Sequence, residues 1–189
     1  MLFTQTKLEG AFIVDLEQRQ DDRGFFARTF CAKEFAAHGL KPTVAQCNLS
    51  FNHKKGTLRG MHYQIAPATE TKLIRCIQGA IYDVLIDMRP ESPTYLSSIS
   101  VELSSENRRA LYVPEMVAHG YQALTNGAEV VYQVGEFYLP GYERGLRYDD
   151  PAFKIKWPLP VSEISDKDTV WPLFESVSRR GELINDYCR

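Results

Sequence analysis

The sequence lacks any long hydrophobic run. None of its apolar stretches approaches the roughly 20 residues that a helix needs to cross a bilayer. The N-terminal stretch MLFTQTKLEG also lacks the basic region followed by an apolar block that marks a secretory signal. We therefore expect a cytoplasmic protein that makes no contact with membranes.

An excess of charge of one sign and paired cysteine motifs are also missing. The formal net charge is −2, with acidic and basic residues mixed along the chain, so we expect no nucleic-acid partner and only local anion sites. The cysteines Cys31, Cys47, Cys76 and Cys188 show no CxxC spacing. Because 189 residues with 44% hydrophobic content can bury a core without crosslinks, we expect reduced thiols and a single domain over residues 1–189.

Long helical patterns are scarce between about residues 43 and 140, where short β-rich runs dominate. Examples are TLRGMHYQ, TKLIRCI, AIYDVLIDM and EVVYQVGEFY, and the segments between runs include KKG, QG, PESP and PEMVAHG. Many short strands with turn residues at this spacing predict an all-β fold, which we interpret as a jelly roll. The one persuasive helix before the C-terminal part is CAKEFAAHGL, residues 31–40, with Gly39 as its stop.

The composition changes after Tyr138. The following segment LPGYERGLRYDDPAFKIKWPLP is rich in proline, aspartate and glycine, and it also contains aromatic residues. A flexible linker would carry few aromatics. We therefore expect residues of about 141–189 to form a long ordered arm, with isolated short strands or helical turns, that packs against another surface.

Histidine is rare, and the four histidines differ in their surroundings. His38, in the expected helix, and His53, in the turn SFNHKKG, are predicted to lie at the surface. His62 and His119 lie in β-rich surroundings, where a hydrogen-bonded core histidine, a metal ligand and a proton-transfer group remain alternatives. Metal-binding jelly rolls commonly use an HxH pair with a nearby Glu, whereas this chain has HYQ, with Gln64 in the second position, so no metal is expected.

Charged residues on neighbouring runs set conditions on any proton chemistry. On a regular strand Asp83 and Asp87 share one face, which we expect to line a cavity or water rather than a dry core. Arg59 and His62 have opposite parity along their strand. They can reach one pocket only if Gly60 introduces a bulge or a bend.

Seven segments, taken in order, resemble the dTDP-4-dehydrorhamnose 3,5-epimerase family. They are DDRGFF, QCNLS, KGTLRGMHYQ, TKLIRCIQGAIYDVLIDMRPESPTY, LSSENRRALYVPEMVAHGY, EVVYQVGEFYLPGYERGLRYDDP and WPLPVSEISDKD, and they extend from Asp21 to Asp168. The resemblance implies a cupin-type jelly roll that forms homodimers and uses neither a metal nor an organic cofactor. It also implies that the substrate is a nucleotide-diphosphate sugar, which is inverted at C3 and C5 beside a C4 ketone.

The resemblance also implies roles for individual residues. His62 matches the general base, Asp168 the carboxylate that pairs with it, and Tyr132 the acid that returns a proton from the opposite face. Lys72 matches a catalytic position beside the sugar, where a cation would stabilise the enolate oxygen. The matching substrate-binding positions are Arg59 and His119 near the sugar, Arg23, Gln46, Asn48, Glu143 and Lys167 near the nucleotide or diphosphate, and Tyr138, which would stack on the base.

Some positions depart from the family pattern around the nucleotide. Arg28 stands where the family usually has Glu, which reverses the hydrogen-bond polarity, and Cys47 and Leu49 replace polar residues. These departures leave open the nucleotide base and the sugar. The alternatives are an epimerase acting on C3 or C5 alone, a 3,4-ketoisomerase, a non-catalytic sugar-nucleotide binding module and a metal-dependent oxygenase, which Gln64 disfavours.

Overall fold

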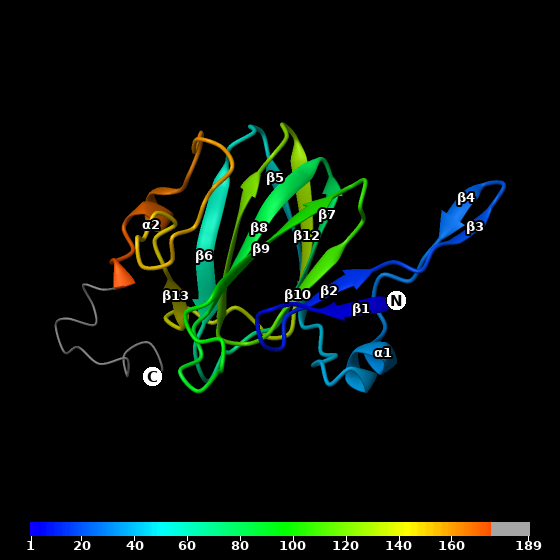
Figure 1. Ribbon diagram of the computed structural model, residues 1–189, viewed down its shortest axis with the longest axis horizontal. Coiled ribbons are helices and arrows are strands. Elements are labelled where there is room, and N and C mark those ends of the chain that lie inside the picture. Colours follow the sequence, from blue (N-terminus) through cyan, green and yellow to red (C-terminus); the bar gives the residue numbers. More distant parts are fainter. Residues whose placement is uncertain (175–189) are drawn as a thin grey trace.

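Two antiparallel β-sheets form the body of the computed structural model, which describes residues 1–174 (Figure 1). The six-stranded sheet has the order β1 (Leu2–Gln5), β2 (Phe12–Asp15), β10 (Ala110–Val113), β7 (Lys72–Gln78), β12 (Ala128–Val134) and β5 (Gln46–Asn52). The five-stranded sheet has the order β13 (Glu143–Gly145), β6 (Leu58–Gln64), β11 (Val117–Ala123), β8 (Ala80–Asp87) and β9 (Ser98–Ser104). The described residues also contain a separate hairpin of β3 (Arg19–Asp21) and β4 (Gly24–Phe26) and the short helices α1 (Ala32–Ala37) and α2 (Asp166–Thr169).

The connections confirm the predicted all-β, cupin-type jelly roll. From β5 to β12 the chain crosses repeatedly between the two sheets, and most neighbours within a sheet are not consecutive in sequence. The core between the sheets contains apolar side chains from both, including Ile74 of β7, Leu85 of β8 and Val130 of β12. No helix within residues 1–174 has the length and apolar character needed to cross a membrane.

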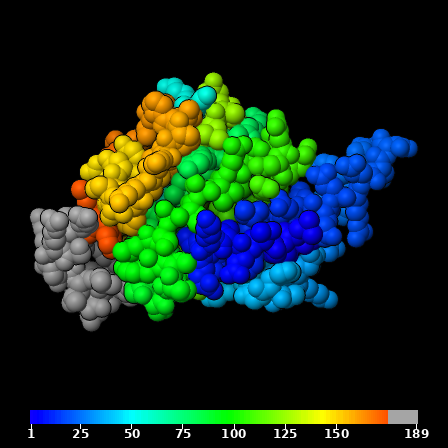
Figure 2. All heavy atoms as spheres, viewed as in Figure 1, coloured from blue at the N-terminus to red at the C-terminus, as the bar shows by residue number. Residues whose placement is uncertain are grey.

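Strand β8 is buried on both faces, because the arm covers its outer side. Its inward residues join the core between the sheets, while Val84 and Ile86 point outward and pack against arm residues such as Phe153 and Trp157. Figure 2 shows the arm, in yellow and orange, as a continuous layer on this side of the molecule. The arm was expected to pack against another surface, and for its described part that surface is the β core.

The N-terminal segment differs from the expectation, which started the β core near residue 43. Strands β1 and β2 extend the six-stranded sheet, and Val14 of β2 pairs with Ala110 of β10. The predicted helix is present as α1; it buries Phe35, and Gly39 follows it with a φ of +71°.

The assignment of PEMVAHG to a turn was wrong. Strand β11 already begins at Val117, whose Cα pairs with that of Asp87. The connection from β10 therefore spans only residues 114–116, between Val113 and Val117. The long-range pairing with β8 overrides the local turn signal of the proline and the glycine.

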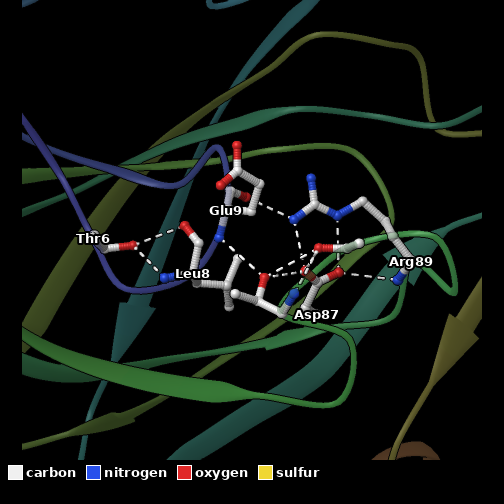
Figure 3. A network of polar contacts seen from close by, with 7 residues as sticks. Thr6, Leu8, Glu9, Asp87 and Arg89 are labelled. Carbon is white, nitrogen blue, oxygen red and sulfur yellow. Dashed lines mark hydrogen bonds and ion pairs between the residues drawn. The ribbon is translucent and has the colours of Figure 1, made fainter.

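Asp87, one of the two acidic residues on this face of β8, does not meet water. This residue is fully buried, and it accepts hydrogen bonds from Nε of Arg89 at 2.8 Å and from the hydroxyls of Ser92 and Thr94, each at 2.6 Å. Arg89 also donates to the carbonyl oxygen of Glu9, which ties the N-terminal loop to the turn after β8 (Figure 3). Burial alone would raise the pKa of Asp87, but these hydrogen bonds hold it below its ordinary value. The expectation of a cavity or water at Asp87 was wrong.

Candidate active site

A cavity of about 640 Å³ lies between the sheets. Its walls come from β5, β7 and β12 of one sheet, from β6 and β11 of the other, and from residues 163–168 of the arm. Cavities of a few hundred Å³ with convergent polar groups are typical of small-molecule sites. The barrel therefore offers one wall from each sheet and a third from the arm.

Gly60 lets two neighbours of opposite parity face this cavity. The register between β6 and β11 shifts between His119 and Tyr121, and Gly60 has a φ of +103°. Both Arg59 and His62 consequently line the cavity. The irregularity at Gly60 that the sequence requires for this meeting is present.

The close approach at Gly60 yields a stability prediction. A Cβ there would lie 2.6 Å from the carbonyl oxygen of His119 and 2.7 Å from Cα of Gly120, both backbone atoms. We expect Gly60→Ala to lower the free energy of unfolding by about 3 kcal/mol or more, measured by urea denaturation. Gly141→Ala is the matched control, because Gly141 also has a positive φ, +90°, but open space around the added Cβ. An equal loss in both variants would show that the crowding at Gly60 is unimportant.

His62 and Asp168 form the central pair of the site. Nε2 of His62 lies 2.6 Å from Oδ1 of Asp168, although the two residues are 106 positions apart. Asp168 is 3% exposed, and its Oδ2 accepts a hydrogen bond from the backbone N–H of Gly60 at 3.2 Å. Burial would raise the pKa of Asp168, but the hydrogen bonds from His62 and Gly60 keep it below its ordinary value. An ionised Asp168 holds a proton on Nε2 and leaves the lone pair of Nδ1 available as a base.

A second carboxylate lies on the other side of the imidazole. Oε1 of Glu143, in β13, is 4.0 Å from Nδ1 of His62. Glu143 also forms an ion pair with Lys167 of the arm, and this hydrogen bond raises the pKa of the lysine. The imidazole of His62 therefore lies between two carboxylates, one of which is paired with a cation.

His119 faces the cavity beside His62, with Asp83 behind it. The Cα atoms of the two histidines are register partners across β6 and β11. Nε2 of His119 is 2.7 Å from Oδ1 of the fully buried Asp83, although the angles at this contact are outside the range of a directional hydrogen bond. Asp83 does not itself line the cavity, so the expectation that it would was wrong. Its carboxylate instead faces a cavity histidine.

Two cations in the cavity wall are held by neighbours that the sequence reasoning missed. Nζ of Lys72 is 3.0 Å from Oε1 of Glu70, and both side chains are nearly buried. Alternation along an extended chain places residues i and i+2 on one side, and this spacing was the available signal for Glu70. Nε of Arg59 donates to Oδ1 of Asn52 at 2.9 Å, and Asn52 also contacts the hydroxyl of Tyr121.

Tyr132 approaches from the opposite wall. It lies on β12 of the six-stranded sheet, where its Cα pairs with those of Asn48 and Ile74, and it lines the cavity. His62 lies on β6 of the five-stranded sheet. The two side chains therefore enter one cavity from facing sheets, as a reaction on two faces of a bound molecule requires.

The residues matched to nucleotide contacts divide into two groups. Those that line the same cavity are Gln46, Asn48, Tyr138, Glu143 and Lys167. Arg23 does not line it, because it belongs to the β3–β4 hairpin, which projects away from the sheets (Figure 1) and leaves the Arg23 side chain 90% exposed. Arg28 is also outside the cavity and pairs with Glu34 at 3.0 Å. A site for Arg23 within its own chain is thus not supported.

Within residues 1–174, the remaining histidines and cysteines do not line this cavity. His38 and His53 are exposed, as predicted. Within residues 1–174, Cys31, Cys47 and Cys76 are free thiols, and no group of three or more His, Cys, Asp and Glu side chains is placed to hold a metal ion. Cys188 lies outside the described residues.

Comparisons with known proteins find several similar chains. A family model described as dTDP-4-dehydrorhamnose 3,5-epimerase matches residues 5–176. The protein of that name from Methanothermobacter thermautotrophicus is 42% identical over 178 residues, covering 92% of this chain and 95% of the relative. The structure of dTDP-6-deoxy-D-glucose-3,5-epimerase from Legionella pneumophila, in complex with dTDP-4-keto-L-rhamnose, is similar with a TM-score of 0.82 and 35% identity over 88% of this chain and 89% of that one.

A mono-epimerase is also similar to this chain. The structure of ChmJ, a 3′-monoepimerase from Streptomyces bikiniensis in complex with dTDP-quinovose, has a TM-score of 0.84 and 32% identity, covering 94% of this chain and 90% of that one. The overall fold therefore does not distinguish inversion at one carbon from inversion at two.

Proposed function

Since the chain belongs to the dTDP-4-dehydrorhamnose 3,5-epimerase family and is an isomerase, we propose that it inverts C3 and C5 of dTDP-4-keto-6-deoxyglucose to give dTDP-4-keto-rhamnose. The observation that carries this proposal is that His62 and Tyr132 line one cavity from facing sheets. Inversion needs a base on one face of the sugar and an acid on the other, because a single base would tend to return the proton to the side it left.

The first step is removal of a proton beside the ketone. The C4 carbonyl acidifies the hydrogens on C3 and C5, and the free lone pair of His62 takes one of them. The buried carboxylate of Asp168 stabilises the imidazolium that forms. The electron pair of the broken C–H bond moves to the C4 oxygen, where the cations of Lys72 and Arg59 stabilise the enolate.

The second step returns a proton to the opposite face. The hydroxyl of Tyr132 donates this proton to the carbon, and the C4 carbonyl forms again. The imidazolium of His62 must then lose its proton to solvent and the Tyr132 phenolate must gain one before the second carbon reacts. In the proposed reaction the same pair serves both carbons, and no redox step is needed.

Exposed apolar side chains further suggest an assembly of two copies. Strand β5 is an edge of the six-stranded sheet, and it exposes Leu49 at 60% and Phe51 at 43%, while Phe26 of the hairpin is 67% exposed. A second copy that covers these surfaces would form a homodimer, and a hairpin reaching the partner's cavity would give Arg23 its nucleotide contact. Analytical ultracentrifugation that finds a monomer at assay concentrations would exclude this assembly.

A nucleotide-linked substrate and free thiols support the cytoplasm as the compartment.

Deuterium exchange tests the proposed reaction directly. We expect proton NMR of dTDP-4-keto-6-deoxyglucose with the protein in heavy water to show loss of both the C3 and C5 signals, and a coupled reductase to trap a rhamnose nucleotide. Exchange at one carbon alone would identify a mono-epimerase. A product whose carbonyl has moved would identify a ketoisomerase, and binding without any exchange would identify a non-catalytic binding module.

A further inference from the structure

Gln64 occupies the place at which a metal-binding jelly roll would present its second histidine, and here its side chain has another task. It ends β6 and is 2% exposed. Its Nε2 donates to the carbonyl oxygens of Ala68 at 3.1 Å and of Phe137 at 3.4 Å, and its Oε1 accepts from the backbone N–H of Leu139 at 3.0 Å. One buried amide thus bonds to two separate loops.

The chemistry of these partners requires an amide at this position. Two of the partners are carbonyl oxygens, which only accept, and the third is an N–H group, which only donates. The orientation of the Gln64 amide is therefore determined by the backbone groups around it. A carboxylate would face two carbonyl oxygens with no proton to donate, and a neutral imidazole offers a single donor.

The segment that Gln64 holds carries Tyr138. Strand β12 ends at Val134 and β13 begins at Glu143, so the residues between them belong to neither strand. Gln64 bonds to the backbone immediately before and after Tyr138, and the N–H of Tyr138 itself donates to Oε1 of Gln46 at 3.2 Å. Tyr138 remains 57% exposed while it lines the cavity. Side-chain hydrogen bonds from Gln64 and Gln46 therefore take the place of the backbone hydrogen bonds that a strand would make here.

We propose that Gln64 is a positioning residue, which holds the ring of Tyr138 at the cavity rim for stacking on the nucleobase. The inference rests on the proposed function, since it assigns a nucleotide to this end of the cavity. When a segment is ordered before the ligand binds, the entropy cost of ordering it does not reduce the binding free energy. Loss of the Gln64 bonds should therefore weaken nucleotide binding, whereas His62 and Tyr132, which lie on strands, keep their places.

A double-mutant cycle on dTDP binding tests the coupling between Gln64 and Tyr138. By isothermal titration calorimetry we expect Gln64→Glu and Tyr138→Ala each to weaken dTDP binding about tenfold, because a stacked ring contributes on that scale. The double variant should bind no more than about twofold more weakly than either single variant, since a displaced ring has no stacking left to lose. Turnover at saturating substrate should stay within about threefold of wild type in Gln64→Glu.

Gln122 provides the matched control. It is fully buried, and its amide also bonds to backbone at both ends, donating to the carbonyl oxygen of Leu159 at 2.9 Å and accepting from its N–H at 3.0 Å. Gln122→Glu introduces the same buried carboxylate but has no bond to the segment of Tyr138. In that background Tyr138→Ala should still weaken dTDP binding about tenfold.

Three results would overturn the inference. Unchanged dTDP affinity in Gln64→Glu, or additive effects of Gln64→Glu and Tyr138→Ala, would remove Gln64 as the residue that positions the ring. If Gln64→Glu fails to fold, Gln64→Leu, which adds no buried charge, takes its place in the cycle with the same expectations. Wild-type protein that does not bind dTDP at all would overturn the proposed function together with the inference, which distinguishes that failure from the other two.

Discussion

The His62→Ala variant should lose deuterium exchange at both C3 and C5 by a factor of roughly 10² to 10⁴, the usual contribution of a general base. The exchange rate in heavy water measures proton removal itself, without requiring that inversion follows. Because the His62 side chain is 30% exposed, its removal takes little from the core. The loss should therefore appear in the rate and not in the fraction of folded protein.

His62→Ala also affects Asp168, the partner of His62, and through it the pH dependence of stability. Removal of the imidazole leaves Asp168, at 3% exposure, without one of the hydrogen bonds that lower its pKa. In the wild type a lowered folded-state pKa stabilises the fold above the ordinary carboxyl value of 3.8, and this stability is lost as the pH falls through the folded value. Without His62 the folded-state pKa of Asp168 rises, so this carboxylate contributes less stability at neutral pH and less is lost as the pH falls. His62→Gln, which retains a donor for Asp168, separates this stability effect from the loss of the base.

The control for His62→Ala is His53→Ala. His53 is exposed and lies outside the cavity, so its removal should leave exchange at C3 and C5 at the wild-type rate. If folded His62→Ala protein exchanged both protons at that same rate, another group would have to be the base.

Local sequence patterns were sufficient for the β architecture but not for its edges. The turn residues between short β-rich runs predicted the strands from β5 to β12, because each run is long enough to show alternation or a β-branched block. Strands β1 and β2 are only four residues each, and β2 is paired with β10 nearly a hundred residues away. Such a pairing depends on tertiary contacts that a local window does not contain.

The acidic residues of β8 show the same limit from another side. Alternation correctly placed Asp83 and Asp87 on one face of the strand, but it could not decide whether that face meets water or partners. The decision depends on Arg89, Ser92 and Thr94 around Asp87 and on His119 in front of Asp83. The last contact joins two strands and cannot be deduced from either one alone.

For the candidate site, the sequence could single out residues but not their geometry. Family resemblance singled out His62 and Asp168, yet only the path of the arm explains how residues 106 positions apart come within 2.6 Å. The alternation of side chains along the strand required a break at Gly60 before Arg59 could join them. It could not show that this break occurs. Resemblance could not show, either, that Arg23 lies away from the cavity of its own chain.

Tyr132→Phe should separate exchange from inversion. The variant keeps the ring that packs against the core but has no hydroxyl to donate a proton, so His62 can still remove and return a proton on its own face. We expect deuterium exchange to continue, while formation of the trapped rhamnose nucleotide falls by a factor of roughly 10² or more. Following the C3 and C5 signals and the trapped product in the same heavy-water sample measures both quantities.

Two outcomes would contradict the assignment of Tyr132, and each has a distinct meaning. Normal formation of the epimer in Tyr132→Phe would mean that another group supplies the proton. Equal loss of exchange and inversion would mean that the hydroxyl is needed for proton removal, for example to orient the sugar, and that an acid on the second face has not been found. Tyr82→Phe is the control, because the Tyr82 hydroxyl bonds to Ser100 at 2.7 Å outside the cavity, and its loss should change neither quantity. If Tyr132 is a proton donor on the facing sheet, its loss should reduce inversion without reducing exchange, since that donor acts only after the enolate has formed.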